Sequence, residues 1–587
     1  MEVEDTTLQA VGDLTNLWGT KPLRAEGVSL VVDLAGRGGD LPPSEEREML
    51  LAEMRTRKVD KPNEVLGSTN TALVMVSATI PPGAQRGDPL DIEVRVPPRG
   101  SVQSLAGGWL MQTRLREYAR LNKRLATGHL MAIAQGDVLI DAFVEGEDDE
   151  VSLIRGRVLG GGRVVKDRSL GLTLRDENLS VQTSTRVGKA INERFNVHDH
   201  GTRKGVAVPK RDDFVEVVVH PRYRDNLVRY FRVIQAIAVR EADSGLVMRM
   251  ESLKKRLAHA PSAAKAALEL EAIGADAVGV LRGALTSHDP EVRFYAAEAL
   301  AYMNEPAAAP ILAMAAKTEP AFRWRSLTAL SAMEDGKAYE ELEELLSVES
   351  AETRYGAFRS IRAMNANEPM VAGEHLGEKI YYHVLDSAGP PMVHVALSHR
   401  PEIVLFGNEH HLQHPVVVFA GKEIVIRSAD DGGLTVTRVT AGEDDRHLTT
   451  STNLDEVIRG VVELGGDYSD VVQLLRDLKV NHSLLARLEF GALPQVGRTY
   501  HRAKKGASDG KPPWNMDSSS ETASLTDGVG SESSGELPEA TQLEVERLLS
   551  GQADLADAPE PSTGENLAPI VDASTARNSG DGAASRR

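Results

Sequence analysis

Three stretches of the chain repeat one pattern, and this repetition constrains the fold more than any other feature. The stretches cover residues 291–303, 321–333 and 352–364, at offsets of 30 and 31 residues. Repeats of this length are typical of stacked helix pairs, each of which buries its apolar face against the next pair. The equivalent positions hold Arg293, Arg323 and Arg354; Phe294, Trp324 and Tyr355; Leu300, Leu330 and Ile361; and Met303, Met333 and Met364. The pattern predicts an α-solenoid over residues 250–366.

These repeats resemble HEAT repeats, although their period is shorter than the usual one of about 40 residues. A fourth and weaker copy is predicted at residues 262–285. The column of arginines has two interpretations, a structural pairing between repeats or a role in binding. Solenoids commonly serve as interaction surfaces, but the sequence names no partner for this one.

Strict alternation marks two strands in the first third of the chain. Leu90, Ile92, Val94 and Val96 alternate with charged residues, and residues 74–80 alternate in the same way. A period of two indicates a strand with one buried and one exposed face. The Pro- and Gly-rich residues between the runs predict a stiff loop, so the pair forms part of a sheet with no evident chemistry.

The same region carries a family resemblance, which rests on three blocks in a fixed order. They are V-S-A-T-I-P-P-G-A-Q-R-G-D-P-L-D-I-E-V at 76–94, S-L-A-G-G-W-L-M-Q-T-R-L at 104–115, and A-I-A-Q-G at 132–136. Together they resemble the bacterial flagellar basal-body P-ring protein family. The resemblance implies a non-enzymatic subunit of a closed homo-oligomeric ring in the periplasm, around the flagellar rod. It implies other rod and ring proteins as partners, with peptidoglycan as a further candidate.

The resemblance extends over residues 7–240 and 395–490. Its later parts include a strand, turn and helix at 172–195 and two amphipathic helices between 454 and 478. We therefore predict an α+β multidomain protein whose β-rich body is split by the helical repeats. The predicted parts are 1–240 (P-ring-like), 250–366 (HEAT-like), 370–495 (P-ring-like strands and a helical hairpin) and 501–587 (disordered tail). The tail is rich in Ser, Gly, Asp and Glu and too poor in apolar residues to offset chain entropy.

A further helix is predicted at residues 44–58. Ser44 is a suitable N-cap, and Glu45 and Glu46 complement the positive end of the helix dipole. Arg55 and Arg57 complement the other end, so this basic cluster has a structural explanation besides a contact role.

Composition excludes several classes of function. The chain has no cysteine, so it has no disulfide, thiolate metal site or Cys nucleophile. Its formal net charge of −19 disfavours nucleic-acid binding, and no run approaches the roughly 18 apolar residues of a membrane span. The acidic start at Met1 contains no apolar signal region, so an export signal is expected upstream of Met1 or was removed.

The one cluster with metal-ligand chemistry consists of His410, His411 and His414, with His394 and His399 upstream. In a helix, His410 and His414 would share a face and could hold zinc. Because the flanks are strand-like and H-E-x-x-H is absent, we expect the side chains not to converge. The acidic residues 147–150 lack the spacing of a calcium loop and predict a solvated turn. No P-loop or G-x-S-x-G pattern occurs, so no enzyme activity and no cofactor are predicted.

The favoured function is thus a structural ring subunit, with the Pro81–Pro89 loop and the surface around Ser104–Leu110 as expected contacts between copies. The alternative is a monomeric envelope adaptor whose helical repeats bind a protein partner.

Overall fold

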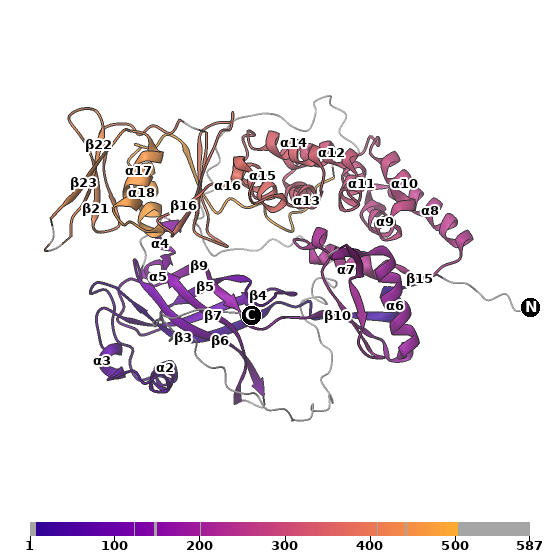
Figure 1. Ribbon diagram of the computed structural model, residues 1–587, viewed down its shortest axis with the longest axis horizontal. Helices are drawn as coiled ribbons and strands as arrows, with labels where there is room; N and C mark the ends of the chain where they lie inside the picture. The colour runs from indigo at the N-terminus through magenta and orange to yellow at the C-terminus, as the bar shows by residue number, and fades with distance from the viewer. Residues whose placement is uncertain are drawn as a thin grey trace, which may run out of the picture. The chain divides into compact units, whose positions relative to one another are not determined.

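The structure is a computed structural model that describes residues 8–121, 124–145, 150–199, 201–407, 409–440, 442 and 444–502. Strands dominate the first 240 residues, helices follow as far as residue 372, and strands then return (Figure 1). The predicted fold class is therefore confirmed. The predicted tail, apart from its first two residues, and most of the predicted turn at 147–150 lie outside the described residues.

A closed barrel forms the first part of the chain. Its seven-stranded sheet has the order β5-β4-β3-β6-β7-β9-β8, and β5 pairs again with β9, which closes the sheet. The strands are β3 (Leu23–Val32), β4 (Ala72–Ile80), β5 (Pro89–Arg95), β6 (Trp109–Leu121), β7 (Arg124–Asp137), β8 (Leu139–Ile140) and β9 (Arg155–Val164). The alternating apolar residues of β4 and β5 are buried in the barrel core, as their period predicts.

Helix α2 (Glu45–Thr56) packs on the outside of the barrel, together with α3 (Pro62–Leu66). The Ser44 side chain accepts the N–H of Arg47, so the predicted cap is confirmed. Leu50, Leu51 and Met54 of α2 are buried against residues of β3 and β4. Two short helices, α4 (Ala142–Glu145) and α5 (Glu150–Leu153), lie between β8 and β9 in the chain.

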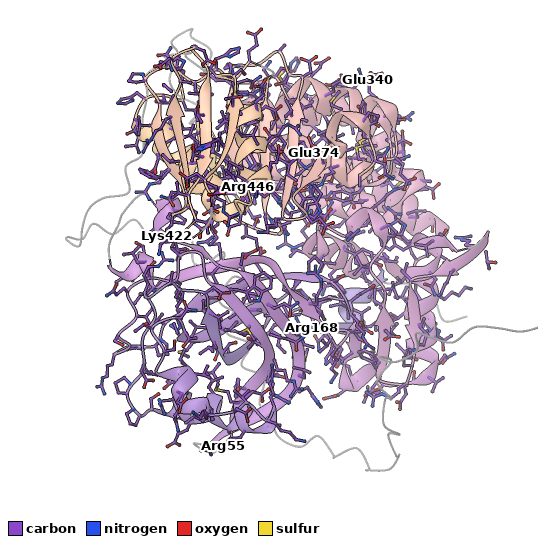
Figure 2. All side chains as sticks on the ribbon, turned by 60° about the vertical axis from the view of Figure 1, so that its left-hand side comes forward. Arg55, Arg168, Glu340, Glu374, Lys422 and Arg446 are labelled. Carbon is purple, nitrogen blue, oxygen red and sulfur yellow. The ribbon has the colours of Figure 1, made fainter. Side chains whose placement is uncertain are left out.

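A second sheet follows the barrel. It has the antiparallel order β13-β14-β10-β2 and packs against α1, α6 and α7. Arg168, marked in Figure 2, ties the sheet to the barrel by donating to the carbonyls of Ile80 (2.7 Å) and Lys21 (2.6 Å). The elements are α1 (Val11–Leu14), β2 (Thr15–Trp18), β10 (Leu170–Leu174), α6 (Val181–Arg194), β13 (Ala207–Pro209), β14 (Phe214–Val217) and α7 (Leu227–Gln235). Two further antiparallel pairs are β1 (Gln9–Ala10) with β15 (Ala238–Arg240), and β11 (Asn196–Asp199) with β12 (Thr202–Gly205).

The repeats form a run of packed helices. They are α8 (Asp243–Leu257), α9 (Ala260–Ile273), α10 (Val278–Ala284), α11 (Pro290–Tyr302), α12 (Ala309–Thr318), α13 (Pro320–Ser331), α14 (Gly336–Leu345), α15 (Ala351–Met364) and the short α16 (Pro369–Ala372). The three aligned stretches are α11, α13 and α15, and α9 with α10 occupies the position of the predicted fourth copy. Leu300, Leu330 and Ile361 are fully buried, as their register predicts. Among the described helices, none has the length and apolar character of a membrane span.

The arginine column joins consecutive helices. Arg293 donates to the carbonyl of Ser287, Arg323 to that of Ala316, and Arg354 to that of Leu346. Each acceptor lies at or just beyond the end of the preceding helix, where carbonyls have no partner within the helix. The column therefore makes the structural pairing between helices that was one of its two interpretations.

Two sheets and a helical hairpin form the last part. The mixed sheet has the order β16-β17-β19-β18-β24, and the antiparallel sheet has the order β20-β21-β22-β23. Helices α17 (Leu454–Glu463) and α18 (Tyr468–Val480) share one core with both sheets, which confirms the predicted hairpin. The strands are β16 (Glu374–Leu376), β17 (Ile380–Leu385), β18 (Met392–Val395), β19 (Glu402–Phe406), β20 (Val417–Ala420), β21 (Ile424–Ser428), β22 (Leu434–Arg438), β23 (Arg446–Thr450) and β24 (Arg487–Phe490).

Candidate functional site

The barrel and the C-terminal sheets share buried surface, although the helical repeats separate them in sequence. Leu139 and Leu159 of the barrel belong to the hydrophobic core of the C-terminal part. Ser469 donates from α18 to the carbonyl of Val138 at 3.4 Å, and Arg476 donates to that of Ala142 at 2.9 Å. The two β-rich parts therefore pack as one body.

A glycine permits a close approach of the two backbones at this contact. Gly160 has φ +58°, and a Cβ added there would lie 2.3 Å from the carbonyl oxygen of His399. The Asp91 carboxylate accepts the N–H of Gly160 at 2.9 Å and also that of His399. The half-buried carboxylate of Asp91 thus holds strand β9 of the barrel and the loop before β19 together.

Beside this contact, the N-terminal turn of α18 holds two neighbouring carboxylates. Asp467 caps the helix, and Asp470 accepts the N–H of Asp467 at 2.9 Å. Burial, followed by the charge of Asp467, raises the pKa of Asp470 to about 6, while Lys379 acts in the opposite direction. This turn therefore carries a carboxyl group that titrates near neutral pH.

A buried ionic network joins the second sheet to the first repeats. Arg229 of α7 binds Glu271 of α9 (Nε to Oε2, 3.0 Å) and Glu298 of α11 (Nη1 to Oε2, 2.6 Å). Arg325 of α13 also binds Glu298, and the hydroxyl of Tyr223 donates to Glu271 at 2.5 Å. Burial opposes the charge on Arg229, but Glu271 and Glu298 outweigh it and raise the pKa of that guanidinium. Two cations and two anions thus neutralise one another in the interior.

A second buried network joins the last repeat to the C-terminal sheet. Glu402 of β19 accepts hydrogen bonds from Tyr355 of α15 (2.9 Å), from Arg400 (Nε, 2.7 Å) and from Arg362 of α15. Burial favours the neutral acid, but hydrogen bonds from His383 and the charge of Arg400 outweigh it and lower the pKa of Glu402. The repeats are therefore anchored at both ends by buried ionic groups rather than by loops alone.

A third contact, which no sequence pattern above predicted, is made by the segment that follows β24. Residues 494–502, here named the strap, cross the first turns of α11, α13 and α15, here named the repeat edge. Arg498 binds Glu352 of α15 through two bonds (2.8 and 2.6 Å), and Arg502 binds Glu291 of α11 through two more (2.6 and 2.8 Å). The available signal was the spacing of Arg498, Tyr500 and Arg502 at alternate positions.

The histidines of the predicted cluster occupy separate surroundings. His410 is 2% exposed, whereas His414 bonds to the hydroxyl of Ser428 (2.7 Å) and the carbonyl of Gly432 (3.1 Å). His411 pairs with Asn453 in an isolated β-bridge. Of the upstream pair, His394 lies in β18 and stacks on Tyr355, while His399 lies in the loop that contacts Asp91. Within the described part of the chain, no group of three His, Asp or Glu side chains is arranged to hold a metal.

The two expected contact elements differ in exposure. The Pro81–Pro89 loop is largely exposed, and the backbone N–H of Arg86 bonds to Asp167 at 2.6 Å. Most of Ser104–Leu110 is buried instead, because Leu105 and Leu110 fill the barrel core and are fully enclosed. Only Gly107 and Trp109 of that segment are exposed. The expectation of a contact surface is therefore wrong for most of this segment.

Comparison with known families divides the chain near residue 250, close to where the helical repeats begin. Residues 10–249 match the family model described as "Flagellar P-ring protein", and residues 250–325 match the one described as "HEAT repeats". Both resemblances are therefore confirmed over these residues. The matches end at residue 325, so the resemblance noted for 395–490 stays a prediction.

Individual relatives cover the same N-terminal part. The flagellar P-ring protein of Thermotoga maritima is 30% identical over 244 residues, which is 39% of this chain and 66% of the relative. That of Hydrogenovibrio crunogenus is 29% identical over 242 residues, covering 39% and 61%. The chain thus spans just under two thirds of the length of these relatives. Among solved structures, the complex of CpcE and CpcF of phycocyanin lyase from Nostoc sp. PCC7120 covers 21% of this chain and 81% of its own, with 22% identity and a TM-score of 0.18.

Proposed function

We propose that this chain is a structural, non-enzymatic subunit of the flagellar basal-body P ring, the periplasmic ring around the rod that supports motility. The observation that carries the proposal is the family match over residues 10–249, which spans the barrel and the second sheet completely. Its partners are other copies of itself and the other rod and ring proteins of the basal body. Peptidoglycan is a further candidate partner.

Such a subunit needs a heterologous interface, in which one flank of each copy fits the opposite flank of the next and the rotation closes. The exposed Pro81–Pro89 loop is our proposed contact element. Proline and a short backbone bond to Asp167 restrict it, so it loses little conformational entropy on docking.

The remaining parts have proposed roles in the same subunit. Residues 370–495 complete the ring body, as the burial of Leu139 and Leu159 against the C-terminal strands supports. Residues 250–366 form an insertion into that body. The buried networks around Arg229 and Glu402 support a rigid attachment, so that the insertion holds a fixed orientation at the ring.

The test is the assembly state of the full-length chain. Negative-stain electron microscopy and light scattering at micromolar concentration are expected to show closed ring particles. Substituting Arg86→Glu in the proposed contact loop is expected to reduce the ring fraction, whereas the exposed control Arg211→Glu is not. A stable monomer under all assembly conditions, including the presence of rod proteins, contradicts the proposal.

The HEAT match over residues 250–325 supports one other candidate, a monomeric adaptor that uses its repeats to bind a protein of the envelope. The same measurement separates the two functions. A chain that stays monomeric and binds a single partner through the repeats supports the adaptor, and ring particles contradict it.

A further inference from the structure

The strap places every second side chain on the repeat edge. Arg498 meets Glu352 of α15, Tyr500 stacks on Phe322 of α13 at 4.7 Å, and Arg502 meets Glu291 of α11. Two residues of extended chain advance about 7 Å, and neighbouring helices pack about 8–10 Å apart. Every second side chain of the strap therefore reaches the next repeat along the edge.

The chemistry of the repeat edge matches this order of side chains. Glu291 and Glu352 lie in the first turns of their helices, where the helix dipole favours a carboxylate. Glu352 also binds Arg323 at 2.8 Å, which fixes its direction. Between the two carboxylates, Phe322 stacks on Phe294 at 3.9 Å and presents an aromatic surface. The repeat edge thus presents a carboxylate on α11, an aromatic ring on α13 and a second carboxylate on α15.

The strap is held by side chains rather than by backbone. Within the described residues, the backbone of 494–502 makes no backbone hydrogen bond to the repeat helices. The Arg502 side chain is 54% exposed and that of Arg498 is 28% exposed. A cavity of about 380 Å³ lies beside the start of the strap, lined by Glu352 and Leu493 among others. The arginines are thus partly exposed, whereas the carboxylates beneath them are largely buried, at 4% exposure for Glu291 and 23% for Glu352.

We propose that the repeat edge is a binding site for an extended segment with Arg, Tyr and Arg at alternate positions. The strap fills this site within its own chain, and the strap of a second copy fits it equally. The second copy is the assigned occupant because residues 498–502 carry the required pattern and are already seated on the edge. Exchange of straps would link neighbouring copies, and this step rests on the proposed ring, in which copies lie side by side.

The first experiment tests the site itself in the full-length chain. A released variant carries Arg498→Glu, Tyr500→Ala and Arg502→Glu, and the probe is a fluorescent peptide of residues 491–502. We expect the peptide to bind the released variant and not the wild type. Adding Glu291→Gln and Glu352→Gln to the released variant is expected to weaken binding by about tenfold or more.

Two controls make this result specific. Glu340→Gln, on the exposed surface of α14 (Figure 2), is expected to leave binding unchanged. A peptide in which Thr499 and Tyr500 exchange places is expected to bind weakly, because the alternation is lost. A folded released variant that does not bind the peptide overturns the proposal, as does equal binding to the wild type.

The second experiment tests exchange between copies by reversing charge. One variant has a reversed strap (Arg498→Glu, Arg502→Glu) and the other a reversed edge (Glu291→Arg, Glu352→Arg), so neither can seat its own strap. We expect the mixture to form a complex of both variants that neither forms alone. A chain with all four substitutions regains its own pairs and serves as the folding control.

If the mixture contains only the two separate variants, while the chain with all four substitutions folds well, the proposed exchange of straps is overturned. Ring formation is scored independently on the wild-type chain. Failure of strap exchange and failure of the proposed ring are therefore distinguishable.

Discussion

The carboxylate of Asp91 accepts the backbone N–H of His399, at 2.9 Å to Oδ1 and 2.8 Å to Oδ2, across 308 residues of sequence. Asp91 belongs to β5 of the barrel, and His399 precedes β19 of the C-terminal sheet. The bond shows that the barrel and the C-terminal sheet meet although the insertion of helical repeats separates them in the sequence. An insertion of this kind costs little, since closure entropy grows slowly with loop length.

Gly160→Ala is expected to weaken this contact. The added Cβ would lie 2.3 Å from the carbonyl oxygen of His399, so the loop must move away from Asp91. We expect a loss of about 2 kcal/mol or more in the free energy of unfolding, measured by urea denaturation. Gly36→Ala is the matched control, because its φ is also positive but no atom lies within 4 Å of the added Cβ. Equal losses at both positions would show that the contact contributes nothing.

Arg229→Met is expected to cost about 3–5 kcal/mol, because it removes the guanidinium that both buried glutamates bind. Glu298 then retains Arg325, whereas Glu271 loses this cation and retains the hydroxyl of Tyr223. Urea denaturation again measures the loss. The control is Arg222→Met, which removes a longer pair to the exposed Glu334 and is expected to cost about 1 kcal/mol or less. A similar loss for both variants contradicts the assigned burial of the network.

Leu330→Ala tests the register of the repeats. Leu330 is fully buried, so the truncation is expected to cost about 2–5 kcal/mol. Met314→Ala, at a side chain that is 59% exposed on α12, is expected to change stability by about 0.5 kcal/mol or less. Thermal unfolding followed by circular dichroism compares the two, and equal midpoints refute the alignment.

Asp470→Asn is expected to remove a pH dependence. Because burial and Asp467 raise the pKa of the Asp470 carboxyl to about 6, its ionised form is disfavoured in the folded chain. The wild type therefore loses stability as pH rises from about 4 through 6. Asparagine keeps an oxygen acceptor for the N–H of Asp467 and carries no charge.

The variant is thus expected to equal the wild type near pH 4 and to exceed it near pH 8 by about 1–2 kcal/mol. Urea midpoints at both pH values measure this difference. A difference that is the same at pH 4 and pH 8 would remove Asp470 as the titrating group.

Local patterns predicted the elements well because each depends on neighbouring residues. The alternation of Leu90, Ile92 and Val94 predicted a strand, and the register of Leu300, Leu330 and Ile361 predicted the buried face of the repeats. Both predictions are confirmed. The period of the apolar residues indicates which face of a strand or helix is buried, and all the residues named above are buried.

Closure of the barrel could not be predicted in the same way. It depends on pairing between β5 and β9. The glycines at 160–162 of β9 interrupt the alternation of apolar and polar residues that would mark a strand. The burial of Arg229 was equally hidden, because an arginine on an amphipathic helix ordinarily faces solvent. Its two glutamate partners come from helices far along the chain. The strap could not be predicted from local patterns, because Arg498 and Arg502 bind glutamates that lie 146 and 211 residues away in the sequence.

Because β5 pairs with both β4 and β9, neither β5 nor β9 is an open edge of the barrel sheet in the described part of the chain. Unpaired strands are templates on which further chains add without limit. In the proposed ring, neighbouring copies can therefore meet along β5 and β9 through loops and side chains but not by adding a strand there. Growth by continuous strand addition is blocked at these two strands, and the number of subunits in the proposed ring would be set by the geometry of the loop and side-chain contacts.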